Sequence, residues 1–451
     1  MIVRFLNDQF EIEHACIGVK MSTLNMNATA LLSILQQHLR DVEVADSQIV
    51  FATTDSASVN SSMVDIWNDN ARRLYGDDYD ARFLPWLGCI SHGTSNSGTA
   101  MRKKALHLKE FFRGYKKMSN TSTAARTVWK EVTGTACPVL CDNRWWAWYD
   151  CAKVVLENWT TVPIFLMNLE KRNISEKSTA RMMKIFRDKG NWNILEAQIR
   201  GVITFGKLFR DCCLLFEGDG FVLPFVSEVL REIRDLMQSV LQFQDQHPLF
   251  LDIRKRLSEL DIPNERVKTI LQKHVFPVVE AGLVHFKDNV WSKLGTCFPL
   301  FDAASLFHPL VFLRKANEPK NDRGEHPLFQ TLDQFCEAVS KLKTISRDVF
   351  TFRSLLVGEL ESFKRVAGQF KAELASDPAK HTPSSLWQWW LGLRQRLPNF
   401  FRIACIVVLI LPSSVVERFF SIIKAHTISQ QNAEYEDTFE GRCMAMYNRK
   451  K

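Results

Sequence analysis

The spacing of apolar residues along the first hundred positions predicts alternating strands and helices. Strands are indicated by short apolar or alternating stretches bounded by turn formers, and helices by apolar residues that recur every three or four positions. The predicted elements are, in order, strands at 2–6 and 10–20, a helix at 27–40, a strand at 48–54, a helix after 56 and a strand at 84–90. Mixed sheets covered by helices have this pattern.

From about residue 101 to 397 the apolar spacing becomes almost entirely helical. The predicted helices are at 103–115, 145–169, 178–186, 192–216, 222–243, 267–286, 328–342 and 349–370. Two stretches rich in turn formers and charge, 317–324 and 376–383, predict loops between them. From 397 a strongly apolar run followed by a helix is expected.

Composition and charge permit several classes of soluble protein and exclude others. Of the 451 residues, 46% are hydrophobic and 24% are charged, which excludes a disordered or fibrous chain. The longest apolar run, Ile403–Leu411, is much shorter than the roughly 20 residues of a membrane-spanning helix. We therefore expect no transmembrane segment and, because the start lacks the order of a signal peptide, no secretion.

The charge balance is mildly basic, with 58 Lys and Arg against 50 Asp and Glu, a net charge of +8. This excess permits a polyanionic partner such as nucleic acid, and it also agrees with simple solubility. The 11 cysteines are scattered without the spacing of a disulfide framework. They are interpreted as reduced thiols in the nucleus or the cytoplasm.

The first candidate site residue is Asp55, which follows the strand predicted at 48–54. Side chains at the carboxyl ends of strands face a crevice where ligands and metals bind in sheet-and-helix folds. The alternative is structural, because an Asp followed by Ser-Ala-Ser also caps the helix that comes next.

The second candidate pair is Cys89 and His92, at the end of the strand predicted at 84–90. Two such residues three positions apart can form half of a metal site, but no matching pair follows at a suitable interval. A structural histidine is the alternative.

The third candidate motif is Asp142-Asn-Arg-Trp-Trp-Ala-Trp-Tyr, in which Arg144 is followed by Trp145, Trp146 and Trp148. Arginine beside aromatic rings can neutralise phosphates and stack on unpaired bases. The alternative is helix packing, since Trp145 and Trp148 fall on one helical stripe.

The fourth candidate residue is Glu417, in Pro412-Ser-Ser-Val-Val-Glu-Arg-Phe-Phe-Ser. Ser414 and Glu417 have the spacing of a capping box, in which the carboxylate binds the backbone at the start of its own helix. A carboxylate in the first turn of a helix can equally face a crevice and bind a metal ion.

Taken together and in this order, the motifs resemble those of the hAT superfamily of cut-and-paste DNA transposases and the host proteins derived from them. The matching stretches are Thr54–Asn60, Cys89–His92, Asp142–Trp145, Leu386–Trp390, Leu397-Pro and Leu411–Ser421. The last of these is similar to the C-terminal dimerisation region of the family. The resemblance covers most of the chain.

The resemblance implies an α/β (α+β) fold, a ribonuclease H-like mixed sheet interrupted by a large all-α insertion, with helices predominating overall. The implied domains are 1–100 as the N-terminal part of the core without its first strand, 101–397 as the helical insertion, and 398–451 as the rest of the core with the dimerisation region.

The resemblance also implies roles for particular residues. Asp55 and Glu417 would be the second and third of three carboxylates that hold Mg²⁺ ions for attack on a phosphodiester, with His92 in the same catalytic group. Cys89 and His92 would lie beside the scissile phosphate, while Arg144 and Trp145 would contact the DNA end. The implied dimerisation residues are Trp389, Trp390, Leu409, Leu411, Phe419 and Phe420.

The sequence departs from the family pattern at its start, where the strand with the first carboxylate, typically Asp-x-Trp, is not found. Asp8 falls in the turn of the hairpin instead. We therefore expect a transposase-like protein that retains DNA binding and dimerisation, as a homodimer or larger homo-oligomer, without catalysis. The alternatives are an active Mg²⁺-dependent transposase with a truncated N-terminus, and a host regulatory or scaffold protein that acts through its C-terminal surface. A nuclear location is expected, with the cytoplasm as the alternative.

Overall fold

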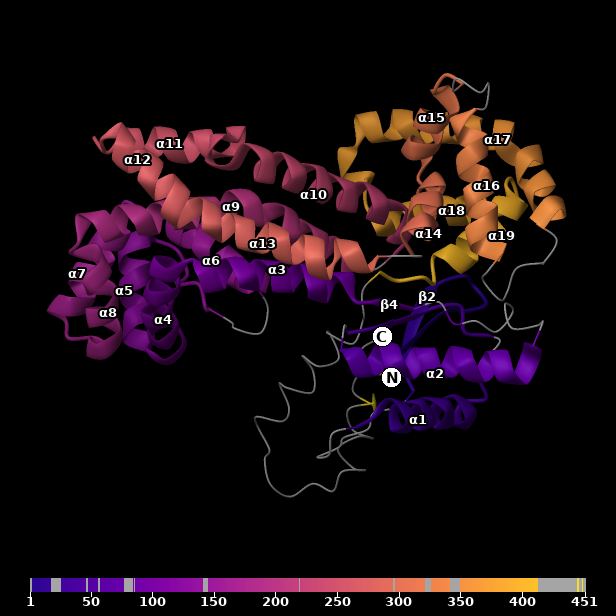
Figure 1. Cartoon of the computed structure of the whole chain (residues 1–451), viewed down its shortest axis with the longest axis horizontal. Helices are drawn as coiled ribbons and strands as arrows, with labels where there is room; N and C mark the ends of the chain where they lie inside the picture. Colours follow the sequence, from indigo (N-terminus) through magenta and orange to yellow (C-terminus); the bar gives the residue numbers. More distant parts are fainter. Residues whose placement is uncertain are drawn as a thin grey trace. The chain divides into compact units, whose positions relative to one another are not determined.

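The computed structural model describes residues 2–17, 26–45, 48–55, 57–76, 84, 86–140, 145–218, 220–294, 297–320, 326–340, 349–412, 444–445 and 448. Over these residues the chain is predominantly helical and contains two small sheets (Figure 1). The helical predominance expected from the sequence is therefore confirmed.

The chain divides into two compact units that are interleaved along the sequence. The mixed unit, which contains both sheets, comprises Met1–Ser91, Leu215–Val229 and Leu294–Lys451. The helical unit comprises His92–Leu214 and Leu230–Lys293. The domains predicted from the sequence, 1–100, 101–397 and 398–451, stay predictions.

A β-hairpin opens the mixed unit, as the sequence predicts. Strand β1 (Ile2–Leu6) pairs with β2 (Ile12–Cys16) in antiparallel register. The turn is held by Asn7, whose side-chain Oδ1 accepts the backbone N–H of Glu11 at 2.9 Å. A short polar side chain that binds its own turn in this way is a common reason for Asn at such positions.

The second sheet joins two short strands in parallel. Strand β3 (Ala52–Thr54) pairs with β4 (Trp86–Gly88), so that Thr54 lies opposite Gly88. Both strands fall inside the predicted stretches and are shorter than expected. Within the described residues the two strand pairs form separate sheets, and the single ribonuclease H-like sheet stays a prediction.

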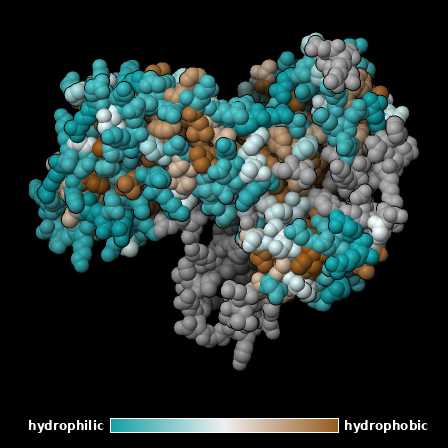
Figure 2. Space-filling view, in the orientation of Figure 1, coloured by the Kyte–Doolittle hydropathy of each residue, from teal (hydrophilic) through white to brown (hydrophobic). Residues whose placement is uncertain are grey.

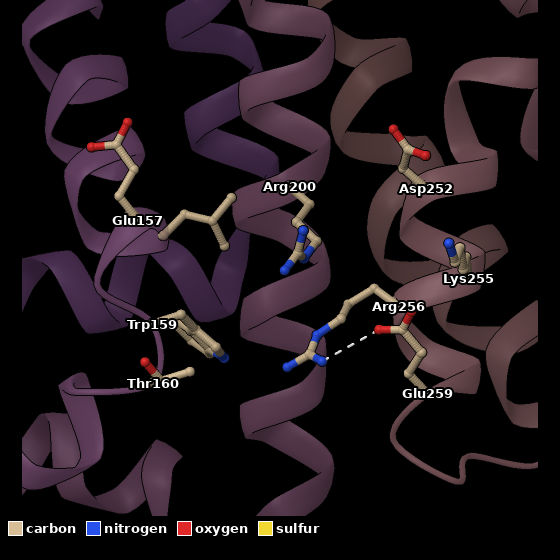
Figure 3. Close-up of a pocket in the computed structure, with 9 residues that line it drawn as sticks. Glu157, Trp159, Thr160, Arg200, Asp252, Lys255, Arg256 and Glu259 are labelled. Atoms are coloured by element: carbon tan, nitrogen blue, oxygen red, sulfur yellow. Dashed lines mark ion pairs between the residues drawn. The ribbon is translucent and has the colours of Figure 1, made fainter.

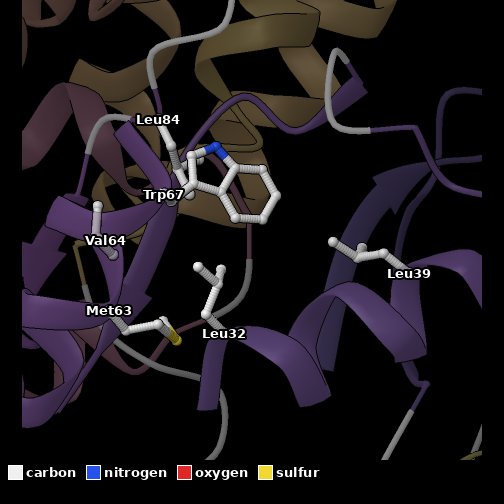
Figure 4. Close-up of a cluster of buried hydrophobic side chains, with 6 residues drawn as sticks. All are labelled: Leu32, Leu39, Met63, Val64, Trp67 and Leu84. Atoms are coloured by element: carbon white, nitrogen blue, oxygen red, sulfur yellow. The ribbon is translucent and has the colours of Figure 1, made fainter. Parts of the chain in front are cut away.

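Helices α1 (Ala28–Asp41) and α2 (Ser58–Tyr75) pack against each other beside these strands. Their apolar faces meet in a small core, shown in Figure 4, that consists of Leu32, Leu39, Met63, Val64, Trp67 and Leu84. Burial of these side chains fixes the α1–α2 pair, because each large apolar side chain removed from water contributes about 1.5–3 kcal/mol.

The remaining helices of the mixed unit surround an aromatic core. They are α14 (Cys297–Ala304), α15 (Pro309–Asn317), α16 (Pro327–Ser340), α17 (Val349–Ser376), α18 (Pro383–Gly392) and α19 (Pro398–Val407). Trp390 is fully buried, and its indole N–H donates to the backbone carbonyl of Phe307 at 3.0 Å. Phe363 and Phe400 pack against the Trp390 ring, with centroids 5.3 and 6.5 Å away.

The helical unit is formed by α4 (Leu106–Thr121), α5 (Thr123–Thr133), α6 (Trp145–Glu157), α7 (Val162–Lys171), α8 (Glu176–Phe186), α11 (Leu251–Ser258), α12 (Asn264–Ile270) and α13 (Phe276–Asn289). Three further helices, α3 (Ile90–Lys104), α9 (Lys189–Phe216) and α10 (Leu223–Phe243), have residues in both units.

Figure 2 shows a mainly hydrophilic surface over the helical unit. Its exposed apolar residues include Leu106 in α4 and Leu251 in α11. Single exposed apolar residues of this kind are normal for a folded protein in water. In the described parts of the chain, no helix combines the length and the apolar character needed to cross a bilayer.

Candidate functional site at the strand ends

Asp55 lies directly after β3, exposed at the carboxyl end of the strand, as expected from the sequence. Its Oδ1 atom accepts two hydrogen bonds, from the backbone N–H of Ala57 at 3.1 Å and from the Asn60 side-chain amide at 2.6 Å. These contacts tie the carboxylate to the start of α2 through an Asx turn, whereas the N-cap residue of the helix is Ala57 and no side chain caps it. The bonds to Oδ1 are compatible with a second partner for the exposed carboxylate.

Cys89 lies at the same edge as Asp55, because β3 and β4 are parallel and end together. The backbone N–H of Cys89 donates to the carbonyl of Thr54 at 2.6 Å, which continues the pairing of the two strands by one residue. The Cys89 side chain is buried, with 2% exposed, and His92 is half-buried in the first turn of α3.

The C-terminal part of the chain returns to this same edge. The Thr53 hydroxyl donates to the carbonyl of Leu411 at 2.7 Å, and the backbone N–H of Ile90 donates to the carbonyl of Pro412 at 3.0 Å. Residues 411–412 are thus held against the ends of both strands. The convergence of Asp55 and Glu417 that the resemblance implies stays a prediction, because Glu417 lies outside the described residues.

Glu217 also lies at this edge, and no pattern in the sequence predicts its presence there. Its Oε1 accepts a hydrogen bond from the buried hydroxyl of Ser91 at 2.8 Å, and Ser91 lies between Cys89 and His92. Glu217 follows the end of α9 and belongs to no recognisable motif, so only the tertiary structure connects it with the strand ends.

Several predicted site residues lie outside the described residues: Arg144, Glu417, Phe419 and Phe420. Trp145 is the first residue of α6, and its side chain is not among those described. The roles assigned to these five residues stay predictions.

The other predicted dimerisation residues occupy two kinds of position. Trp390 and Leu411 are buried inside the mixed unit, with 0% and 8% exposed, so both contribute to the core of the chain itself. Trp389 and Leu409 are half-buried. Pairing of two chains stays a prediction.

The described residues do not by themselves form a metal centre: no three His, Cys, Asp or Glu side chains among them come close enough to bind one ion together. Asp55 has the hard oxygen atoms that Mg²⁺ prefers. The fit of this edge to Mg²⁺ therefore depends on carboxylates beyond those described, such as Glu417.

The described cysteines are free thiols, as predicted, and several are poor nucleophiles. Burial raises the pKa of the Cys336 thiol to about 11 and that of the Cys405 thiol to about 12. Burial also raises the pKa values of Cys151 and Cys212. Because the thiolate is the reactive form, thiol chemistry at these four positions is disfavoured at neutral pH.

Comparison with models of known protein families gives no match to this chain, and a search of curated protein sequences also finds none.

Proposed function

We propose that the protein is a DNA-binding, dimerising protein of the hAT transposase type, with the strand ends of the mixed unit as the remnant of its catalytic edge. The observation that carries the proposal is the return of Leu411 and Pro412 to the ends of β3 and β4, beside Asp55. This contact joins the first and last parts of the chain around one edge, as a core interrupted by an insertion requires.

The short distance in sequence between Pro412 and Glu417 supports the same proposal. Five residues span at most roughly 18 Å when fully extended. Pro412 is bonded to Ile90, one residue after Cys89, and Cys89 is bonded to the residue before Asp55. The proposal therefore needs only these five residues to connect Pro412 with a carboxylate at Asp55.

The distribution of charge supports a polyanionic partner for the helical unit. This unit has 31 Lys and Arg residues against 19 Asp and Glu, whereas the mixed unit has 27 against 31. The basic excess of the chain is thus concentrated in one unit, which is where nucleic acid would bind by neutralising its phosphates.

Mg²⁺ belongs to the alternative in which the protein is an active transposase, with Asp55 and Glu417 as the carboxylates of this chain that would bind it. A bound divalent ion would polarise a phosphoryl oxygen and stabilise the charge that develops on it. The Asp55 side chain would remain oriented by Ala57 and Asn60, because these two donors occupy only Oδ1.

The proposal is tested by measuring DNA binding and assembly on the purified full chain. Fluorescence anisotropy with labelled duplex and single-stranded DNA should show that binding weakens as salt is added. The logarithm of Kd should rise linearly with the logarithm of the salt concentration. Light scattering at the same concentrations should give the mass of a dimer or a larger oligomer. A monomer without measurable DNA affinity at low salt would refute the proposal.

A further inference from the structure

The positive excess of the helical unit is not spread evenly over its surface. At the open pocket shown in Figure 3, three cationic and three acidic side chains line the opening. Arg200 and Arg256 both donate to the buried carboxylate of Glu196, and Arg256 also pairs with Glu259 at 3.5 Å. This pocket therefore carries no net positive charge, and the excess lies elsewhere in the unit.

Helices α4 and α8, which pack against each other (Figure 1), carry a much larger excess of cations. The exposed basic residues along one side of each helix are Lys109, Arg113 and Lys117 in α4, and Lys177, Arg181 and Lys184 in α8. Within each helix these residues are three or four positions apart, so they share one side of it. We refer to the six residues together as the α4–α8 face.

The two rows of cations border on each other at Glu110. The Glu110 carboxylate lies 3.7 Å from Arg113 Nη1 in its own helix and 3.6 Å from Arg181 Nε in the other helix. The helices approach closely at Gly114, where a Cβ atom would lie 2.8 Å from the backbone carbonyl oxygen of Ser178. This close packing holds both rows of cations in one surface at a fixed spacing.

The face keeps its charge after the carboxylates beside it are counted. Its six cations and Glu110 together leave a net charge of +5. Glu176 at the start of α8 and Asp188 after its end reduce this to no less than +3, and Asp188 already accepts the backbone N–H of Asn191 at 3.0 Å. None of the four lysines of the face has a carboxylate partner in the described part of the chain. Their ammonium groups are left to water or to an anionic partner.

The face offers charge without an aromatic platform. Phe111, Phe112 and Tyr115 in α4 are buried, and Phe186 in α8 packs against Trp192 with ring centroids 5.2 Å apart. Proteins that bind single strands stack the bases on exposed aromatic rings. The face therefore suits a partner that presents its phosphates outward and keeps its bases stacked inside, as a duplex does.

The density of charge also suits a duplex. Lys109 and Lys117 are separated by two helical turns and a little more, which is about 12 Å along α4. A DNA duplex carries about seven phosphates over that length of its axis. The six cations of the face are therefore similar in number to the phosphates of the duplex that would lie along it.

We propose that the α4–α8 face binds the phosphate backbone of double-stranded DNA. Contacts of lysine and arginine with phosphates carry no sequence information, so the face provides affinity and orientation. This inference rests on the proposed DNA binding and assigns a particular surface to it.

The experiment compares three forms of the full chain by anisotropy with a labelled DNA duplex: wild type, Lys177→Gln/Lys184→Gln and Lys268→Gln/Lys287→Gln. Lys268 in α12 and Lys287 in α13 are exposed and, like the first pair, have no carboxylate partner among the described residues. Both double variants therefore remove the same charge from the same unit. In Lys177→Gln/Lys184→Gln the slope of log Kd against log salt should fall by about 2, and affinity at low salt should fall roughly tenfold or more. The control variant should change affinity less than about threefold, because salt screens charges that do not contact the phosphates.

Glu110→Gln provides a variant with the opposite expected sign. It removes the carboxylate between the two rows of cations and frees Arg113 and Arg181, so affinity for the duplex should rise by roughly threefold. Glu265→Gln is its control, since Glu265 is exposed in α12 and has no cationic partner in the described chain. A gain of affinity in Glu110→Gln alone cannot result from loss of structure, and circular dichroism of every variant confirms that it is folded.

The outcomes separate the face from the proposed function. Equal affinities of the two double variants, in a protein that binds the duplex, would overturn the face and leave the proposed function standing. Tighter binding of a single strand of the same length than of the duplex would overturn the assignment to double-stranded DNA. If the wild type binds no DNA but binds phosphatidylserine vesicles through Lys177 and Lys184, the face is a membrane surface and both proposals fail. Duplex binding that weakens in Lys177→Gln/Lys184→Gln and strengthens in Glu110→Gln supports the inference.

Discussion

The Thr53 hydroxyl donates a hydrogen bond to the backbone carbonyl of Leu411 at 2.7 Å, across 358 positions of the sequence. Thr53 lies in the middle of β3, and Leu411 follows α19 near the end of the described chain. This bond, together with that from Ile90 to Pro412, holds residues 411–412 against the ends of β3 and β4 within the mixed unit. The candidate site at the strand ends depends on this attachment.

Thr53→Val should lower the stability of the chain by about 1 kcal/mol. Valine has nearly the shape of threonine and lacks the donor, so the carbonyl of Leu411 loses its partner. Urea unfolding followed by circular dichroism measures the change. Thr127→Val is the matched control, because the exposed Thr127 hydroxyl donates to the carbonyl of Thr123 within its own helix. An equal, small loss of stability for both substitutions would mean that the Thr53 bond does not hold residues 411–412 against β3.

Local structure could be predicted from the sequence because its determinants are local. The hairpin follows from a turn-forming Asn7 between two apolar stretches, and Asn7 does bind the turn. The long helices α9 and α10 follow from apolar residues repeated every three or four positions. The ends of the strands before Asp55 and Cys89 could also be located, because short apolar stretches stop there.

Helix α3 was not predicted before residue 103, and its composition explains why. From Ile90 to Lys104 it contains many Ser, Thr and Gly residues, which favour loops in isolation. Packing compensates for this: Thr94 and Ser97 are fully buried, and a Cβ atom at Gly93 would meet Val290 at 2.8 Å. Small residues permit a close approach here, and a single sequence does not reveal the neighbour.

Parts of the candidate sites could not be predicted for the same reason. Glu217 and Ser91 are 126 positions apart, and neither belongs to a motif that implies the other. Glu110 and Arg181 meet through the packing of α4 and α8. Such pairs depend on how helices pack. Trp390, one of the predicted dimerisation residues, is buried, so an apolar motif can belong to the core of the chain itself.

Gly114→Ala should destabilise the helical unit by about 1–3 kcal/mol. A Cβ atom at position 114 would lie 2.8 Å from the backbone carbonyl oxygen of Ser178 and 2.9 Å from Met182 Cγ, so α4 and α8 would have to separate. Gly358→Ala is the control, since a Cβ atom at Gly358 in α17 meets nothing within 4 Å. That substitution should stabilise the chain by up to about 1 kcal/mol through helix propensity. Thermal or urea unfolding of both variants decides the sign.

Acidification should destabilise the mixed unit through His308. His308 Nδ1 accepts the backbone N–H of Leu310 at 3.3 Å, so the neutral ring carries its proton on Nε2 and donates it to His381 Nε2 at 2.8 Å. Burial, together with the smaller effects of the charges of His381 and Arg314, lowers the pKa of His308 to about 3. Phe225 and Phe370 pack against the ring as uncharged neighbours.

The unfolded chain therefore binds a proton at His308 near pH 6.5, whereas the folded chain binds it only near pH 3. The stability due to neutral His308 is present above about pH 6.5 and is lost as the pH falls toward 3, at up to about 1.4 kcal/mol per pH unit. Urea unfolding at pH 7.5 and pH 5 measures this slope. His308→Gln should be less stable at pH 7.5 and should have a shallower slope, and an unchanged slope would contradict the assignment.

Cleavage of DNA provides the last prediction, because it separates a binding protein from an active transposase. With Asp55 and Glu417 as its only proposed metal carboxylates, the chain should hold Mg²⁺ too weakly to stabilise a phosphodiester transition state. Supercoiled plasmid incubated with the protein and Mg²⁺ should be nicked no faster than with Asp55→Ala, while both forms bind DNA equally. Nicking by the wild type that disappears in Asp55→Ala would instead assign catalysis to the strand ends, and Glu217, 2.8 Å from the Ser91 hydroxyl, would be the next carboxylate to substitute.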